Sequence, residues 1–314
     1  MEINREKLAQ RGSIVGIVLN LILATGKLFT GFLTGSLAIM ADGIDSATDI
    51  ATSFLTLIAA KISNRPADAS HPYGHERAET IITKVLSFVI LYAGFEVFTS
   101  AVSNLMAKER DFSNLHIVLI VSFISFLAKI FLYKYKLSIG KKINSSSFIA
   151  DAYNMKNDIF TSASIFIGIL IFFITGFEKI DAILALIVSI FIFKVGIEMF
   201  METSNEIMDG SKELGDIYSL IVKTLENHRE VKNPHKIRVR KNGFVYFIDM
   251  HLEVDENMTV REANEICAKI EEDIISLNNY IKDVTIHIEP IGNMEKEQFG
   301  HNLKTIKKTF GNKE

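Results

Sequence analysis

Six long apolar segments, separated by short polar ones, occupy most of the chain up to residue 208. They span residues 13–33, 37–60, 81–106, 116–135, 148–174 and 181–207. Each is long enough to cross the hydrocarbon core of a bilayer as a helix, which takes ~20 residues, and none contains a proline. The pattern predicts an all-α six-helix transmembrane bundle over 13–208, with the first two helices joined by the turn Thr34-Gly35-Ser36.

Beyond residue 208 the apolar segments become shorter and amphipathic or alternating. The expected elements are a helix over 212–228, strands over 235–241 and 244–254, a helix over 259–277 and a strand over 281–289. The sequence Lys241-Asn242-Gly243 is typical of a hairpin turn, and Thr259 with Glu262 is typical of a capping box. The order α-β-β-α-β predicts a small α+β domain over 209–292. The polar, lysine-rich tail over 293–314 is expected to be disordered.

Positive charge gives the bundle an orientation. One set of loops holds most of the basic residues: Arg5, Lys7, Arg11, Lys61, Arg65, Arg77, Lys134, Lys136, Lys141 and Lys142. The opposite loops hold Lys108, Arg110 and Lys179. By the positive-inside rule, residues 1–12 and the C-terminal end are cytoplasmic, in a multi-pass protein of the cell (plasma or inner) membrane.

Composition supports this division and excludes some functions. Of the 314 residues 48% are hydrophobic and 23% charged, and the mean hydropathy is +0.25. A net charge of −3 without a basic stripe gives no basis for nucleic-acid binding. The single cysteine, Cys267, excludes an internal disulfide and a cysteine-based zinc site.

Two stretches within the apolar segments repeat one pattern, A-D-x-x-[D/N]-x-x-x-D-I-x-T-S, at 41–53 and 150–162. Acids inside a membrane helix are costly and therefore indicate function. Positions i and i+4 share a helix face, so Asp45 and Asp49 form one oxygen pair, and Asn154 and Asp158 another. Four oxygen ligands suit a hard or borderline divalent ion such as Mn²⁺, whereas an imidazole would favour zinc. The alternative is a hydrogen-bonded packing network of protonated acids.

The expected topology inverts one repeat relative to the other, as in many secondary transporters. It places Asp42 toward the outer mouth of a pathway and Asp151 toward the inner mouth. Other intramembrane charges, Lys129 among them, are expected to snorkel or to pair within the helices.

Two further groups are compatible with metal binding. Asp68, His71 and His75 lie in the loop after the second apolar segment, where they hold a second metal or merely orient the loop. His235, His251, His287 and Glu289 fall on the predicted strands of the C-terminal domain, and His287 and Glu289 point to the same side of a strand. Lone surface histidines are the alternative for this group.

Together these motifs resemble the cation diffusion facilitator family from about residue 12 to 290. The resemblance rests on D-x-x-x-D in the second apolar segment, the spaced pair ending in Asp158, and H-P-Y-G-H-x-[R/K]-x-E at 71–79. It implies a homodimeric, proton-coupled exporter of divalent metals with a ferredoxin-like cytoplasmic domain. The transport site would be Asp45, Asp49, Asn154 and Asp158, and the other two groups would be the loop and cytoplasmic sites. Arg77 and Asp209 would interlock the two protomers.

Departures from the family pattern bear on the metal. Asn154 stands where zinc-type members have histidine, so the chain resembles the manganese-type branch. In the cytoplasmic domain Asn264 replaces a histidine of some members, and Glu289 replaces an aspartate. The transported ion is expected to be Mn²⁺, with Fe²⁺, Co²⁺ and Zn²⁺ as alternatives, and no cofactor is expected.

Two other classes of function fit less well. A membrane metalloenzyme would use the histidine loop, but H-E-x-x-H, a nucleophile elbow and a phosphate loop are all missing from the sequence. A membrane-anchored metal sensor would leave the intramembrane acids unexplained.

Overall fold

The computed structural model describes residues 5–63, 65–106, 114–143, 146–177, 179–211, 214–292 and 299–310. The chain divides into two compact units. One, here called the helical unit, comprises Met1–Leu57 and Val85–Phe200, and the other comprises Ile58–Lys84 and Met201–Glu314. The ends of three long helices therefore group with the C-terminal domain.

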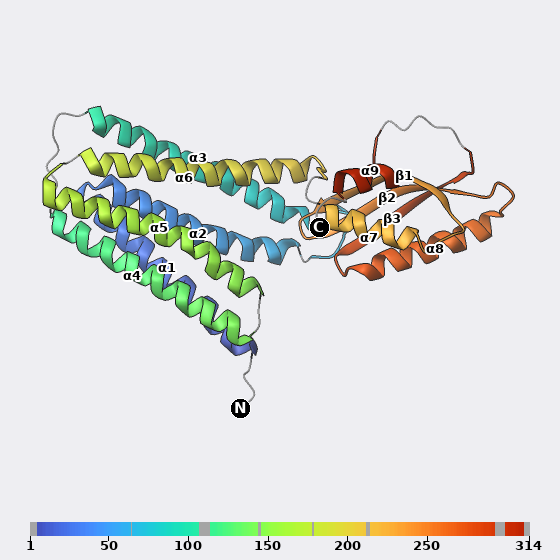
Figure 1. Ribbon diagram of the computed structural model, residues 1–314, viewed down its shortest axis with the longest axis horizontal. Helices are drawn as coiled ribbons and strands as arrows, with labels where there is room; N and C mark the ends of the chain where they lie inside the picture. The colour runs from blue at the N-terminus through green and yellow to red at the C-terminus, as the bar shows by residue number, and fades with distance from the viewer. Residues whose placement is uncertain are drawn as a thin grey trace. The chain divides into compact units, whose positions relative to one another are not determined.

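Six long helices precede the C-terminal domain (Figure 1). They are α1 (Arg5–Thr34), α2 (Leu37–Ser63), α3 (Arg77–Met106), α4 (Leu115–Ile143), α5 (Ser146–Thr175) and α6 (Lys179–Ile207). Within the described residues, five of them are long and apolar enough to cross a membrane, and α2 is not among those five. Because α2 carries three acids, Asp42, Asp45 and Asp49, and is not among the five, a sixth crossing stays a prediction.

Close packing of α1 against α2 sets the position of the first motif. Gly35 has φ +75°, a left-handed conformation that suits glycine, and it forms the predicted turn between the two helices. A Cβ atom on Gly31 would lie 2.7 Å from Met40 Cβ, and one on Gly43 would lie 3.0 Å from the Leu28 side chain. Glycine at these positions lets the two backbones approach closely.

The C-terminal domain contains the predicted elements in the predicted order. They are α7 (Gly215–Leu225), β1 (Lys232–Asn242), β2 (Val245–Val254), α8 (Val260–Leu277) and β3 (Ile281–Pro290), followed by α9 (Leu303–Phe310). The sheet has the order β1-β2-β3, with β1 and β2 antiparallel and β2 and β3 parallel. Helices and strands share one hydrophobic core that includes Tyr218, Ile221, Ile237, Ile248 and Ile270.

Local signals set the boundaries of these elements. Gly243 has φ +61° and forms the turn between β1 and β2. Thr259 accepts a hydrogen bond from the Glu262 backbone N–H at 3.3 Å, and the Glu262 carboxylate accepts one from the Thr259 N–H at 2.8 Å. The predicted capping box at the start of α8 is therefore confirmed.

The tail is ordered where the structure describes it, so the prediction of disorder is wrong for residues 299–310. His301 forms an antiparallel bridge with Ile237 of β1, and Ile306 of α9 is buried in the domain core. Phe310 stacks on Tyr218 with ring centroids 4.9 Å apart. The tail is polar in overall composition, but a few apolar side chains spaced along the short helix α9 are enough to pack it against the domain. Residues 293–298 and 311–314 lie outside the described part of the chain.

Candidate metal sites

The two repeated motifs, on α2 and α5, are in contact through Asp42. Ser162, in the second motif, lies within 3.5 Å of a carboxylate oxygen of Asp42, in the first. Asp45 and Asp158 are half-buried and Asp49 is exposed. The charges of Asp45 and Asp49 interact with each other and with Asp158. The fold thus places the three acids of the predicted transport site in one region. These three acids and Asp42 are here called the acid cluster.

The predicted tetrad itself stays untested. Asn154 and Asp151 lie on α5, but their side chains are outside what the structure describes. Among the described residues, Asp45, Asp49 and Asp158 do not form a group whose ligand atoms all lie within 4.8 Å of one another. For these acids to bind one metal ion, their side chains must therefore move, or other residues must supply further ligands.

Two fully buried lysines border the acid cluster. Lys27 Nζ lies 2.7 Å from Asp42 Oδ2, and Lys129 Nζ lies 3.5 Å from Asp158 Oδ2. Of the two explanations offered for Lys129, pairing is confirmed and snorkelling is wrong, because its side chain is only 1% exposed. Lys27 was not among the predicted site residues, although a lysine inside a long apolar segment is a signal for such a role. Asp42 was predicted to lie toward the outer mouth of the pathway, and that prediction did not include its buried partner, Lys27.

Another buried acid, Asp181 at the start of α6, fixes the start of α2. Its Oδ2 accepts a hydrogen bond from the Leu37 N–H at 2.8 Å and its Oδ1 one from the Ala38 N–H at 3.3 Å, and the Ser36 hydroxyl donates to it as well. A carboxylate at a helix N-terminus binds the free N–H groups and complements the helix dipole. Asp181 therefore positions the helix that carries Asp45 and Asp49, a role with no motif in the sequence.

The loop group is assembled as predicted from Asp68, His71 and His75. His71 Nδ1 lies 3.5 Å from Asp68 Oδ1 and His75 Nε2 lies 3.4 Å from Asp68 Oδ2. Each of the three offers a ligand atom within 4.8 Å of the others. The Ser70 hydroxyl, the His71 N–H and the Ser70 N–H donate to Asp68 and lower its pKa to about 2. The carboxylate is therefore ionised, as a metal ligand must be.

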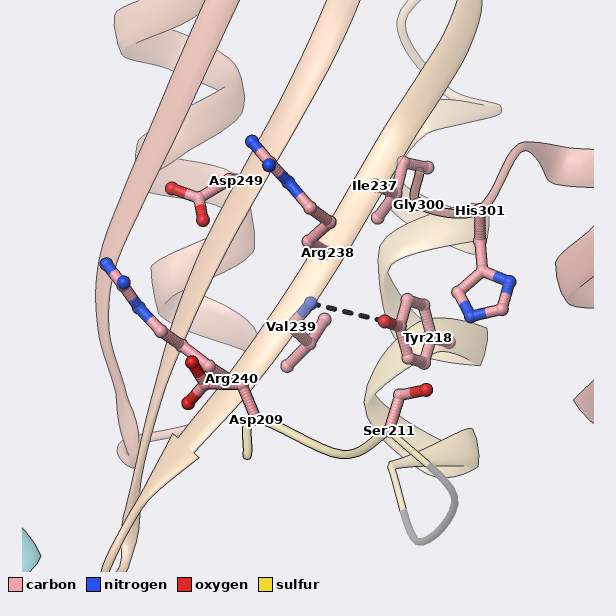
Figure 2. A pocket seen from close by; sticks show the side chains of 10 residues that line it. All are labelled: Asp209, Ser211, Tyr218, Ile237, Arg238, Val239, Arg240, Asp249, Gly300 and His301. Atoms are coloured by element: carbon pink, nitrogen blue, oxygen red, sulfur yellow. Dashed lines mark hydrogen bonds between the residues drawn. The ribbon is translucent and has the colours of Figure 1, made fainter. Parts of the chain in front are cut away.

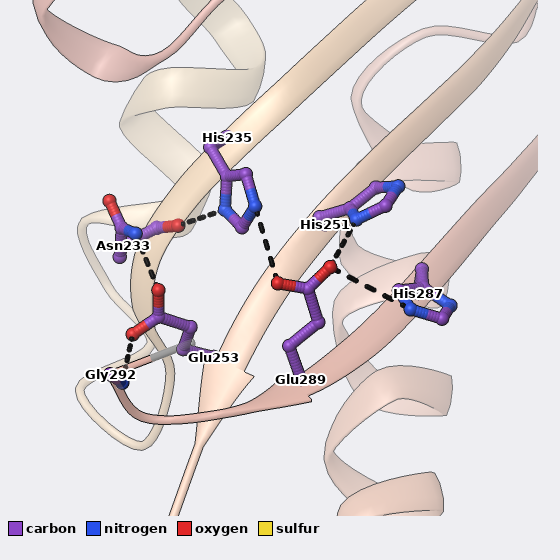
Figure 3. A network of polar contacts seen from close by, with 7 residues as sticks. All are labelled: Asn233, His235, His251, Glu253, His287, Glu289 and Gly292. Carbon is purple, nitrogen blue, oxygen red and sulfur yellow. Dashed lines mark hydrogen bonds and ion pairs between the residues drawn. The ribbon is translucent and has the colours of Figure 1, made fainter. Parts of the chain in front are cut away.

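Strand register assembles the second group, His235, His251 and Glu289, here called the histidine cluster (Figure 3). His235 is paired with His251 across β1 and β2, and His251 with His287 across β2 and β3. Glu289 is buried between them, with one oxygen 2.6 Å from His251 Nδ1 and the other 3.4 Å from His235 Nε2. His287 Nε2 is 3.7 Å from Glu289 but 63% exposed, so it lies at the rim.

Hydrogen bonds orient the histidine cluster. His235 Nδ1 lies 2.8 Å from the Asn233 carbonyl, which directs its other ring nitrogen toward Glu289. The Asn233 amide also donates to buried Glu253, and Glu253 accepts from the Gly292 N–H at 3.1 Å. Partners of this kind fix the orientation of metal-binding histidines.

The predicted charge pair forms within one chain. Arg77 Nη2 lies 2.7 Å from Asp209 Oδ1, and Arg77 Nε donates to Asn242 Oδ1 at 2.9 Å. Asp209 follows the end of α6 with φ +56°, a left-handed conformation that aspartate tolerates. The pair joins the start of α3 to the end of α6 and to the β1–β2 turn. Whether it also interlocks two protomers stays a prediction.

A separate cavity of about 320 Å³ opens beside β1 (Figure 2). Arg238, Arg240, Asp209 and Asp249 are among its lining residues. Because these are two guanidinium and two carboxylate groups, the lining favours neither an anion nor a cation. Burial raises the pKa of Tyr218, whose hydroxyl accepts a hydrogen bond from the Val239 N–H, so this side chain is a structural one.

Comparisons with known proteins match both parts of the chain. Residues 13–208 match the cation efflux transmembrane domain, and residues 214–291 match the cytoplasmic domain of cation efflux proteins. The manganese efflux system protein MneP of Bacillus subtilis (strain 168) is 31% identical over 92% of this chain and 99% of its own length. MneS of the same organism is 31% identical over 91% and 97%. The metal-bound C-terminal domain of the CzcD transporter from Thermotoga maritima is 45% identical over 26% of this chain and 93% of that chain, with a TM-score of 0.25.

Proposed function

The chain belongs to the cation efflux family, the cation diffusion facilitators, and from that premise we propose that it exports Mn²⁺ from the cytoplasm in exchange for protons. As a multi-pass metal efflux transporter it is not an enzyme. The observation that carries the proposal is the acid cluster, because three carboxylates of two repeated motifs lie in one region between apolar helices, where uncompensated charge is costly.

The ligand types support Mn²⁺ as the transported ion. In the proposed site Asp45, Asp49, Asn154 and Asp158 supply oxygen atoms and no imidazole, and such sites suit Mn²⁺ better than zinc. Two relatives that span nearly all of this chain are named for manganese efflux. Fe²⁺, Co²⁺ and Zn²⁺ remain the alternative substrates within the same family.

Carboxylates are the proposed carriers of the protons. An asparagine side chain does not titrate in this range, so the candidates that release protons when the metal binds and take them up when it leaves are Asp45, Asp49 and Asp158. This exchange couples metal export to proton entry. Asp42 and Asp151 would lie along the pathway on either side of the site.

The proposed setting is a homodimer in the cell membrane with both termini in the cytoplasm. The matched cytoplasmic domain is of the dimer-forming type, and Arg77 with Asp209 would help to hold the protomers together. The loop group and the histidine cluster, with His287, would bind cytoplasmic metal rather than carry it across the membrane.

Flux measured in proteoliposomes tests this function. Purified protein should move Mn²⁺ faster than Zn²⁺, Co²⁺, Fe²⁺ and Cd²⁺, and a trapped pH indicator should report proton movement in the opposite direction. Asp158→Asn should abolish both fluxes. The matched control is Asp216→Asn, at an acid of the C-terminal domain. Faster Zn²⁺ than Mn²⁺ flux would contradict the metal assignment, and coupled flux that survives in Asp158→Asn would contradict the site.

A further inference from the structure

The two buried lysines beside the acid cluster are held in different ways. Lys27 Nζ makes a short contact with Asp42 and also donates to the Ser46 hydroxyl at 3.0 Å. Lys129 Nζ lies 3.5 Å from Asp158 and makes no hydrogen bond to any residue that the structure describes. Lys27 is thus a fixed structural partner, whereas charge alone holds Lys129 beside its carboxylate.

Lys129 lies on the inward face of α4. One turn earlier, the buried hydroxyl of Ser125 also lacks a hydrogen-bond partner among the described residues. Buried polar atoms without partners are uncommon and call for an explanation. An ammonium group on a flexible four-carbon chain can move, and no hydrogen bond to a described residue holds that of Lys129 in one position.

We propose that the Lys129 ammonium is a built-in counter-cation of the transport site, which occupies the place beside Asp158 until a divalent metal displaces it. The proposal rests on the proposed function, because it takes Asp158 as a metal ligand. An ammonium has three donors and no lone pair, so it cannot ligate the metal. It competes with the metal for the same carboxylate, and it weakens metal binding.

Charge balance explains the use of such a group. In the metal-bound state of the proposed mechanism the four carboxylates of the acid cluster are ionised, and with the ammonium groups of Lys27 and Lys129 they sum to two negative charges, which one divalent ion cancels. Without the lysines the same acids would hold a divalent ion more tightly, because opposite charges interact strongly away from water. Lys129 returning to Asp158 would help to expel the metal, and it would balance the Asp158 carboxylate while Asp45 and Asp49 take up protons.

Charge-removing variants at Lys129 test the proposal. Lys129→Gln and Lys129→Met should lower the KM for Mn²⁺ and tighten equilibrium Mn²⁺ binding about tenfold, which corresponds to about 1.4 kcal/mol. Maximal flux should fall, because release becomes slower. Lys129→Arg keeps the charge and should stay close to wild type in affinity. Lys194→Gln is the matched control, at an exposed lysine paired with Glu198 on α6.

The binding measurement isolates the transport site in the full chain. Binding that disappears on adding Asp49→Asn counts as transport-site binding, and the remainder belongs to the other metal groups. Structural damage would weaken binding, so a gain in affinity is specific to the proposed role. Unchanged or weaker binding in both Lys129→Gln and Lys129→Met would overturn it. If Asp49→Asn and Asp158→Asn keep wild-type flux and binding, the proposed function fails instead, whatever the lysine variants do.

Discussion

The acid cluster of the helical unit and the histidine cluster of the C-terminal domain are built in opposite ways. In the helices the three acids of the proposed transport site are half-buried or exposed, their ligand atoms do not all lie within 4.8 Å of one another, and a lysine held by charge borders the site. In the sheet, Glu289 is 3% exposed between histidines that strand register and hydrogen bonds hold in place. The first arrangement suits an ion that must bind and leave, and the second suits an ion that stays.

The largest expected effect separates the two clusters by their part in transport. Asp49→Asn should lower Mn²⁺ flux more than about a hundredfold, or about 2.7 kcal/mol, because it removes both a ligand and a proton carrier. Glu289→Gln should leave flux within about tenfold of wild type while it abolishes metal binding by the histidine cluster. Flux in proteoliposomes and metal content of the purified chains check both. Equal losses of flux would mean that the histidine cluster also takes part in transport.

The rigidity of the C-terminal domain can be tested through α9. Ile306→Ala should remove about 2 kcal/mol or more of local stability, because it leaves a cavity in the core. Amide exchange in α7 should then quicken about thirtyfold, while exchange in α4 and α5 stays unchanged. Lys308→Ala, at an exposed position of the same helix, is the control. Unchanged exchange in α7 would show that the tail does not support the domain.

The sequence predicted what depends on local pattern. The helix segments, the α-β-β-α-β order and the capping box at Thr259 follow from periodicity and short-range signals, and the structure contains them. Strand alternation also predicted that Glu289 shares a side with His287, but the burial of Glu289 against His235 depends on register between strands. Spacing within a single strand does not determine that register.

Partners distant in sequence could not be predicted in this way. Lys27 with Asp42 and Lys129 with Asp158 join different helices, and a helix pattern does not show which helices are neighbours. Asp181 binds the start of α2 from 144 positions away, with no motif to announce it. The prediction of a disordered tail was wrong for another reason. Helix α9 has only eight residues, and its burial depends on the surface that α7 and β1 provide.

The preference for one metal over another tests the difference between the two clusters at a single proposed ligand, Asn154. Asn154→His should shift the ratio of Zn²⁺ to Mn²⁺ flux about tenfold toward zinc, because an imidazole makes the helical site more like the histidine cluster. Asn154→Gln, which keeps an amide oxygen, is the control and should lower flux for both ions without changing their ratio. An unaltered ratio in Asn154→His would mean that this position does not select the ion.

The smallest effect is expected at Arg77 and Asp209, which are about half exposed. Exposed ion pairs contribute about 0–1 kcal/mol, so Arg77→Asp or Asp209→Arg alone should reduce transport and dimer stability only modestly. The double variant should recover part of the loss, because it restores opposite charges. Recovery should be incomplete, since Asp at position 77 cannot donate to Asn242 as Arg77 Nε does.

A double-mutant cycle on dimer dissociation and on flux measures the coupling, and Arg65→Asp, at an exposed residue of the same unit, is the control. Coupling in flux but not in dissociation would assign the pair to contacts within one chain, where the structure places it, rather than to an interlock between protomers.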